Sequence, residues 1–397
     1  MKLFMIILSL SCHSFLYAAA LKQLNSNLQY INSFIPKNNS KIINIKRFES
    51  GDSFINDVFL CTTSTNKQYV IKIGNSSWNK VKTLNEILSI RLMSKETNIP
   101  VPKVIGYQLS KKNPINKEFI IMEKIEGVPL SLIYDKIKDK KIFFEILDHL
   151  ASLLKEMRKV SFSKLGNLSL DINNDVKIIA PIEIHLSADT PPPENFREYS
   201  IMLLEYYNLI IQKSFSLSCA RKGKIQNMVN SIIQTINTCF VENTEEKFVF
   251  SHQDLVMKNI LVKGNKVVGI VDWEWAGPGL EEIESISGLD FLSKDEHMAY
   301  FKQRIKSLDF LIFPLSNNKL RLEILKFAGL IYRIAAFEEW AGEKEFLHTA
   351  RFIDDKMFQR HIKKCNIQEP SKIIELIMKD IEDKYYEITR RFKGCVA

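Results

Sequence analysis

The sequence predicts an α+β protein in which strands come first and helices dominate the remainder. Near the N-terminus, INIKRFESGDSFINDVFLCTT and KQYVIKIG are apolar runs interrupted by turn residues, as paired strands are. From about Phe196 onward apolar residues recur mostly at helical spacing. With 397 residues, 46% hydrophobic and 25% charged, the chain has the composition of a globular protein with two or three domains or lobes.

The distribution of charge and the spacing of the cysteines limit the kinds of ligand and of structural site that the chain is expected to have. Lys and Arg number 55 against 46 acids, and the resulting net charge of +9 is spread along the chain. That distribution disfavours a nucleic-acid groove, whereas a basic protein favours small anionic ligands such as nucleotides. The six cysteines are scattered without a CxxC pair, so neither a zinc site nor a disulfide framework is indicated. The oligomeric state is left open.

Residues 1–20 have the layout of a secretory signal peptide. Lys2 precedes an apolar run, Leu3 to Leu10, and small residues at Ala18 to Ala20 predict cleavage after about Ala20. We therefore expect export, the alternative being a cytoplasmic protein with an apolar first helix. No stable membrane span is expected once the leader is removed. Export from a eukaryotic cell would make three glycosylation sequons relevant, at Asn38, Asn75 and Asn167.

The second predicted strand, KQYVIKIG, places a lysine beside apolar residues. Ile71 and Ile73 share one face of the strand, and Val70 and Lys72 share the other. A lysine on an inward face is costly unless an anionic group meets it. Two interpretations stay open, an inward Lys72 with an anionic partner and a solvated Lys72 on an edge strand.

A helix is expected next, because Leu84, Ile87, Leu88 and Leu92 recur at helical spacing. It should end before Pro100. Glu86 lies in its middle and, considered alone, is one more surface acid. A short apolar strand, Phe119 to Met122, then closes the first part of the chain.

The stretch FSHQDLVMKNILVKGNKVVGIVDWEWAG carries acids at the ends of an apolar hairpin. Gly264 and Asn265 form a two-residue turn between two strands, so the hairpin brings Asn259 near Asp272. An amide and a carboxylate at one edge suit a hard cation such as magnesium. Asp254, on the loop leading in, could accept a proton or orient a hydroxyl. Phosphoryl transfer needs this combination.

Ordered motifs in the chain resemble a known family. HQDLVMKN fits H-x-D-x-x-x-x-N, the catalytic-loop pattern of the kinase superfamily, and IVDWEWAG sits where that family carries its metal-binding Asp. The stretch is similar to the aminoglycoside phosphotransferase and choline kinase-like branch, the phosphotransferase enzyme family. YVIKIG, NEILSIRLMSKETNIPVPKVIGY, FIIMEKIEGVPL and FSKLGNL follow the family's order, from about Phe48 to Ile286.

The resemblance implies a two-lobed protein-kinase-like fold. Residues 21–125 would form a small β-rich N-lobe that binds ATP. Residues 126–397 would form a larger, mainly helical C-lobe with the catalytic and acceptor sites. In the acceptor region Glu338, Glu339 and Trp340 could attract a cationic substrate, or could form a solvated helix face with a core tryptophan.

The resemblance also assigns roles to single residues. Asp254 would orient the substrate hydroxyl, with His252 bracing the catalytic loop. Asn259 and Asp272 would hold Mg²⁺, and Glu274 would add a metal contact or support the metal ligands. The nucleotide would be bound by residues of the N-lobe, namely Lys72 at the phosphates, Glu86 positioning Lys72, Gly51 in a sparse glycine loop, and the backbone of Met122, Glu123 and Ile125 at the adenine.

The function implied is an ATP- and Mg²⁺-dependent phosphotransferase that acts on a hydroxyl of a small molecule, aminoglycoside-, choline- or sugar-like. One alternative is a kinase-fold binding module without turnover, or a secreted effector. A protein kinase is disfavoured, because Asp-Trp-Glu replaces the Asp-Phe-Gly of that class. An exported kinase would need ATP in a lumen or in another cell.

Overall fold

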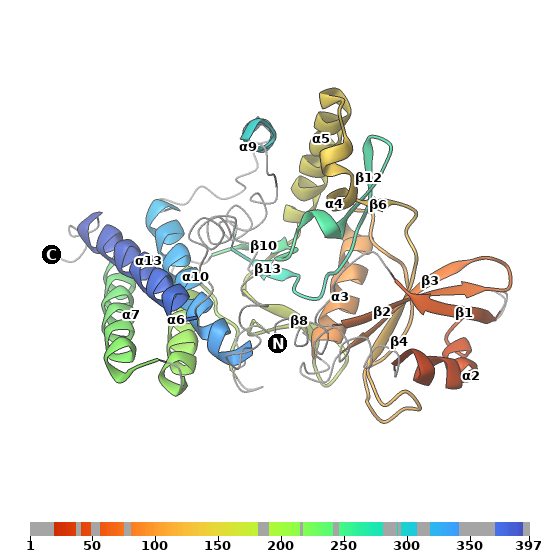
Figure 1. Cartoon of the computed structure of the whole chain (residues 1–397), viewed down its shortest axis with the longest axis horizontal. Coiled ribbons are helices and arrows are strands. Elements are labelled where there is room, and N and C mark those ends of the chain that lie inside the picture. The colour runs from red at the N-terminus through yellow and green to blue at the C-terminus, as the bar shows by residue number, and fades with distance from the viewer. Residues whose placement is uncertain are drawn as a thin grey trace, which may run out of the picture.

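The computed structural model describes residues 20–36, 41–48, 56–74, 81–181, 190–214, 217–240, 246–280, 292, 295–307, 318–340 and 370–391. Figure 1 shows an antiparallel sheet at one end of the molecule and a group of long helices at the other, with short strands between them. The α+β, two-lobed prediction is thereby confirmed.

The N-lobe is built on one antiparallel sheet in the order β1-β2-β3-β5-β4. Its strands are β1 (Ile42–Arg47), β2 (Asn56–Thr63), β3 (Gln68–Gly74), β4 (Val104–Gln108) and β5 (Phe119–Glu123). Because β3 lies between β2 and β5, Lys72 is on a central strand and only 8% exposed. The edge-strand interpretation of Lys72 is therefore wrong. The predicted glycine loop at Gly51 lies outside the described residues.

Helices cover both faces of this sheet. Helix α3 (Val81–Glu96) ends before Pro100, as predicted, and packs with Ile120 and Met122 on one face. On the other face, the helical residues 20–26 and α2 (Leu28–Asn32) bury Leu24 and Ile31 against the sheet. Side chains alternate along a strand, so Lys72, next to Ile71 and Ile73 of the second face, points toward α3.

Short strands between the two ends form the frame of the central region. The predicted hairpin is confirmed as β11 (Ile260–Lys263) and β12 (Lys266–Ile270), with Gly264 at φ 62° in its turn. β11 also pairs with β6 (Val128–Pro129). β10 (Phe248–Ser251) pairs with β7 (Ser161–Phe162) and β13 (Gly277–Gly279), and β8 (Asn167–Leu170) pairs with β9 (Val176–Ile179). Short helical turns complete this region: α4 (Leu130–Ile133), η1 (Tyr134–Lys136) and η2 (Met257–Asn259).

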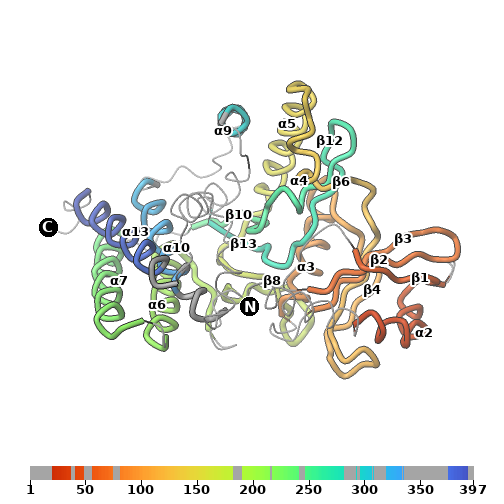
Figure 2. The backbone as a smooth tube through the Cα atoms, in the orientation of Figure 1, coloured from red at the N-terminus to blue at the C-terminus, as the bar shows by residue number. Residues whose placement is uncertain are grey.

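The C-lobe is mainly helical, as predicted. Its longer helices are α5 (Lys140–Arg158), α6 (Phe196–Lys213), α7 (Cys219–Cys239), α9 (Asp295–Ser307), α10 (Asn318–Trp340) and α13 (Pro370–Arg391). Figure 2 shows α6, α7, α10 and α13 side by side, and these helices share one apolar core. Three of the helices begin at a side-chain cap, with Asp139, Asn195 or Ser218 accepting a bond from a backbone N–H.

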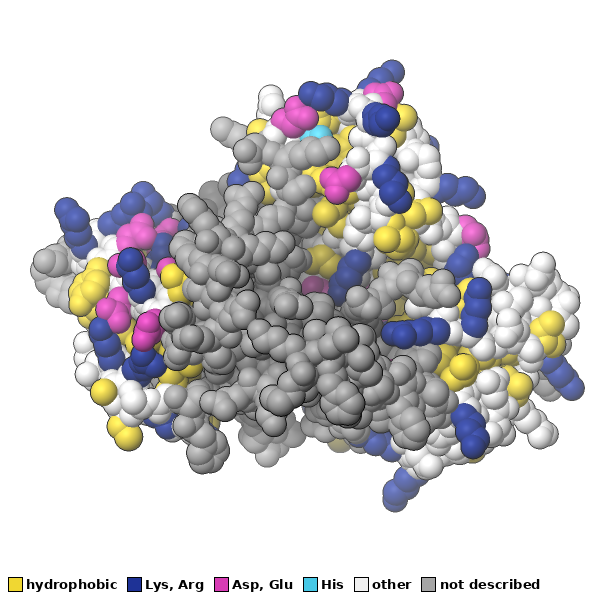
Figure 3. Space-filling view, viewed as in Figure 1, with side chains coloured by type: hydrophobic (Ala, Val, Ile, Leu, Met, Phe, Trp, Pro, Cys, Tyr) yellow, Lys and Arg dark blue, Asp and Glu magenta, His cyan; other side chains and the backbone are white. Residues whose placement is uncertain are grey.

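The placement of surface charge and the hydrophobicity of the helices are relevant to the predictions about nucleic-acid and membrane partners. In the view of Figure 3, Lys and Arg side chains are scattered over both ends of the molecule rather than gathered in one stripe. None of the helices in the described ranges is long and apolar enough to span a membrane. Cys61, Cys219 and Cys239 are free thiols, and the other three cysteines lie outside the described residues.

Gly166, in the FSKLGNL motif, has a backbone that excludes larger residues. Its φ is 147°, and a Cβ built there would lie 1.9 Å from the Ile179 carbonyl oxygen. We expect Gly166→Ala to lower the free energy of unfolding by about 3 kcal/mol in urea denaturation. The matched control is Gly223→Ala on α7, where nothing lies within 4 Å of the added Cβ. That variant should be more stable by about 0.5–1 kcal/mol. A Gly166→Ala midpoint equal to the wild type would contradict the close contact.

Candidate functional site

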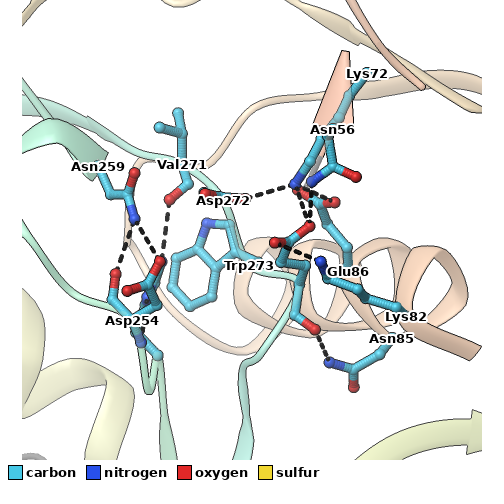
Figure 4. Close-up of polar contacts among 12 residues, drawn as sticks. Asn56, Lys72, Lys82, Asn85, Glu86, Asp254, Asn259, Val271, Asp272 and Trp273 are labelled. Carbon is cyan, nitrogen blue, oxygen red and sulfur yellow. Dashed lines mark hydrogen bonds and ion pairs between the residues drawn. The ribbon is translucent and has the colours of Figure 1, made fainter. Parts of the chain in front are cut away.

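The polar residues of the chain's motifs gather where the N-lobe sheet and α3 meet two loops of the central region. One loop follows β10 and carries His252 and Asp254. The other follows β12 and carries Asp272 and Glu274. Figure 4 shows Asp254 and Asp272 of these loops on one side of the site and Lys72 and Glu86 of the N-lobe on the other.

His252 braces the two loops together. Its ring is fully buried, Nε2 donates to the Val271 carbonyl oxygen at 3.1 Å, and Nδ1 accepts from the Asp254 N–H at 3.3 Å. The ring also lies 4.6 Å from the buried indole of Trp273. Because both ring nitrogens are engaged with the backbone, the geometry gives His252 a bracing function rather than a proton-transfer function.

Asp254 and Asn259 form a local pair. The Asn259 Nδ2 donates to the Asp254 carbonyl oxygen at 2.8 Å and to its carboxylate Oδ2 at 3.2 Å. Burial, reinforced by the negative charge of Asp272, raises the pKa of Asp254 to about 7. A carboxyl group with that pKa is suited to accept a proton near neutral pH, although a cation bound nearby would oppose the rise.

The hairpin brings Asp272 to Asn259, as the sequence predicts. The Val271 N–H donates to the Asn259 carbonyl oxygen at 3.0 Å, and the next residue, Asp272, has φ 70°. The Asp272 carboxylate is 2.5 Å from the Lys72 ammonium. Burial alone would raise the pKa of Asp272, but the Lys72 charge outweighs it and lowers that pKa to about 2.

Lys72 is the centre of the charge network. Its ammonium lies 2.9 Å from Glu86 of α3 and 2.8 Å from Glu274, besides its contact with Asp272. Burial lowers the pKa of Lys72, yet the three carboxylates together hold it well above its usual value. Burial, only partly offset by Lys72, raises the pKa of Glu86 to about 7. The pairing of Lys72 with Glu86 across strand and helix is therefore present.

Three polar residues that sequence reasoning missed surround Glu274. They are Asn56 of β2 and Lys82 and Asn85 of α3, all less than 9% exposed. Burial lowers the pKa of Lys82, and the negative charge of Glu274 offsets only part of this effect. A polar residue gives no sequence signal of burial when its partner is distant in the chain, and Asn56 and Glu274 are 218 positions apart. Among these three residues, a sequence signal exists for Asn85 alone, since it directly precedes Glu86.

The backbone after β5 offers a hydrogen-bonding edge next to the sheet. The N–H groups of Glu123 and Lys124 are already bonded, to the carbonyl oxygens of Lys103 and Gln68. Within the described ranges, the Ile125 N–H has no backbone partner. In the segment predicted to contact adenine, the backbone N–H of Ile125 is therefore a candidate hydrogen-bond donor. Met122 is buried in the core beneath this segment.

The predicted metal ligands have suitable oxygens. Asn259 uses its amide nitrogen toward Asp254, so its Oδ1 is turned away from that carboxylate (Figure 4). In the Asp272 carboxylate, Oδ1 contacts the Lys72 ammonium, and Oδ2 is the second oxygen that a metal could use. No group of three His, Cys, Asp or Glu side chains in the described part of the chain could hold a metal. An Asn–Asp pair fits Mg²⁺, which takes few protein ligands together with phosphate oxygens.

The remaining residues singled out in the sequence either fall outside the described residues or are not part of this site. Gly51, Asn38 and Asn75 fall outside the described residues, as do the side chains of Glu338, Glu339 and Trp340. Asn167 is 4% exposed, and its amide donates to the carbonyl oxygens of Trp275 and Ala276. The folded chain therefore does not present Asn167 for glycosylation.

Comparison with known proteins agrees with this geometry. The model of the phosphotransferase enzyme family matches residues 44–307, well over half of the chain. The solved structure of the ADP-bound aminoglycoside phosphotransferase APH(2'')-Ib is 17% identical, with a TM-score of 0.53 over 82% of this chain and 95% of that one. The gentamicin complex of APH(2'')-IIa is 15% identical, with a TM-score of 0.51 over 87% and 96%. At such identities the likeness shows the fold.

Curated relatives match over a shorter region. Altered inheritance of mitochondria protein 9 of Debaryomyces hansenii is 26% identical over 133 residues, 31% of this chain and 21% of that protein. Its namesake in Saccharomyces cerevisiae is 24% identical over 168 residues, 38% of this chain and 26% of that protein. The match thus spans only about a fifth to a quarter of these relatives' length.

Proposed function

Because the chain belongs to the phosphotransferase enzyme family, we propose that it is a small-molecule kinase that transfers the γ-phosphate of ATP to a hydroxyl group. One observation carries the proposal. Lys72 is paired with Glu86 and Asp272, and Asp272 lies at the hairpin edge beside the Asp254–Asn259 pair. A phosphate-neutralising cation, oxygen ligands for a metal and a carboxylate base are thus assembled in one site.

Each group has a defined task in the proposed reaction. The Lys72 ammonium neutralises phosphate oxygens of the bound nucleotide. Asp254 orients the acceptor hydroxyl and takes its proton as the oxygen attacks the γ-phosphorus, while the bond from that phosphorus to the β–γ bridging oxygen breaks and ADP leaves. Asn259 and Asp272 would hold Mg²⁺, which supplies positive charge against the transferring phosphoryl group. The Ile125 N–H donates to the adenine ring.

The acceptor class we propose is an aminoglycoside-, choline- or sugar-like alcohol. Support comes from the fold shared with the two aminoglycoside phosphotransferases, which are named for their acceptor. The residues that would contact an acceptor in the region of Glu338 to Trp340 have no described side chains.

An ATP-consumption screen against hydroxylated small molecules tests the proposed function. We expect at least one alcohol to raise ATP turnover well above the rate in water, and EDTA to abolish the increase. Asp254→Asn should lose the alcohol-dependent part, by about 10²- to 10⁴-fold. Nucleotide binding without any acceptor-dependent turnover would favour the alternative, a kinase-fold binding module.

We also propose that residues 1–20 direct export and are removed. Ala20, at the proposed cleavage site, begins the helical residues 20–26, and the first fully buried side chain of that segment is Leu24. A protein lacking residues 1–20 loses, of the described core, the small side chain of Ala20, and should therefore keep an unfolding midpoint close to that of the wild type. A protein lacking residues 1–35 should lose Leu24, Ile31 and Ile35 from the core, at a cost of several kcal/mol. Mass spectrometry of the native protein checks the cleavage, and an intact Met1 peptide would contradict export.

A further inference from the structure

The Glu274 carboxylate contacts three different elements of the N-lobe. Its Oε2 accepts a hydrogen bond from Asn56 Nδ2 of β2 at 2.7 Å and lies 2.8 Å from Lys72 Nζ of β3. Its Oε1 lies 2.8 Å from Lys82 Nζ of α3. The Glu274 side chain is 5% exposed. A residue on a loop of the central region therefore bonds to β2, β3 and α3 at once, as Figure 4 shows for the three donors.

The backbone of the same loop is bonded to α3 as well. Asn85 Nδ2 donates to the carbonyl oxygens of Glu274 at 3.0 Å and Ala276 at 2.8 Å. Its Oδ1 accepts from the Leu168 N–H of β8 at 2.7 Å. The Lys82 ammonium also lies 4.8 Å from the centre of the Trp275 ring. These bonds join α3 to the loop that carries Asp272.

These contacts distinguish two roles for Glu274. As a metal ligand it would have to give up a buried cation on at least one oxygen, since Oε2 is held by Asn56 and Lys72 and Oε1 by Lys82, and a buried charge without its partner is strongly unfavourable. We propose instead that Glu274 is a positioning residue that ties α3 and β3 to the Asp272 loop and so, together with Glu86, holds the Lys72 ammonium in place. The linkage stands on the contacts alone, whereas its consequence for nucleotide binding rests on the proposed function.

Amide hydrogen exchange tests the linkage without any nucleotide. Glu274→Gln keeps the size of the side chain but removes the charge that Lys72 and Lys82 share. We expect the amides of α3 to exchange about tenfold faster, equivalent to ~1.4 kcal/mol, while those of α7 stay unchanged. Glu96→Gln, at the exposed end of the same helix, should leave the exchange of α3 as in the wild type. Unchanged α3 exchange in Glu274→Gln would overturn the proposal.

A double-mutant cycle tests the specific partner. If Glu274 acts through Lys82, then Lys82→Met combined with Glu274→Gln should accelerate α3 exchange by less than the product of the two single effects. Strictly multiplicative effects would show that Lys82 and Glu274 act independently, against the proposed pair.

Calorimetry with ADP separates positioning from metal binding. A positioning role predicts that Glu274→Gln binds ADP about tenfold more weakly at saturating Mg²⁺, with the same Mg²⁺ concentration at half-maximal binding. A raised Mg²⁺ requirement with unchanged α3 exchange would make Glu274 a metal ligand and overturn the proposal. A wild type that binds no ADP would instead contradict the proposed function, and the exchange experiment would still decide the linkage.

Discussion

Replacing Asp272 by asparagine is expected to lower kcat for phosphotransfer by about 10³-fold or more, because a preorganised charge at the transferring phosphate is lost. The carboxylate contacts Lys72, and the preceding residue, Val271, is bonded to the Asn259 backbone, so we expect the charge of Asp272 to serve the phosphate-binding lysine and the metal position together. Lys72 keeps Glu86 and Glu274 as partners in the variant, and we therefore expect the protein to stay folded.

Asparagine is the appropriate substitution because of the backbone. Asp272 has φ 70°, a conformation that asparagine tolerates and that costs alanine roughly 1 kcal/mol or more. Asp175→Asn, in the exposed turn between β8 and β9, is the matched control and should transfer phosphate at the wild-type rate. Phosphotransfer by Asp272→Asn at the wild-type rate and ordinary Mg²⁺ would remove Asp272 from the site.

The local patterns of the sequence predicted the parts of the site that are close in the chain. The Gly264–Asn265 turn sets the hairpin, and the hairpin sets the approach of Asn259 to Asp272. The helical spacing of residues 81–96 likewise placed Glu86 on a helix. Such features depend on residues a few positions apart, which is the range over which periodicity and turn chemistry act.

Contacts between distant segments could not be predicted in the same way. Whether Lys72 was inward or solvated depended on strand order, since β3 becomes central only when β5, almost 50 residues later, pairs with it. Asn56, Lys82 and Asn85 have ordinary polar sequence neighbours, and their burial appears only once α3 meets the loop at Glu274. The assignment of Glu86 as the partner of Lys72 came from the family resemblance, not from its helix.

Replacing Lys72 by methionine is expected to weaken ATP binding by about 10- to 100-fold, the effect of losing charged hydrogen bonds to phosphate. Glu86→Gln should weaken it only a few-fold, because Asp272 and Glu274 still hold the ammonium. Lys72→Met also leaves three carboxylates without their shared cation, which should lower the free energy of unfolding by about 3–5 kcal/mol. Calorimetric titration with Mg²⁺ and ATP, beside urea unfolding, measures both effects.

Two further variants show whether a loss of ATP affinity in Lys72→Met comes from the lost phosphate contact. Lys46→Met, on the exposed side of β1 in the same sheet, removes the same charge without touching the network and should bind ATP like the wild type. Glu86→Gln keeps most of the network intact, so it reports on nucleotide affinity even where Lys72→Met is too unstable to measure. Equal ATP affinity in all three variants and the wild type would show that the buried Lys72 stabilises the fold without binding phosphate. A Glu86→Gln defect as large as that of Lys72→Met would mean that Glu86 alone positions the ammonium, and that the contacts with Asp272 and Glu274 do not hold it in place.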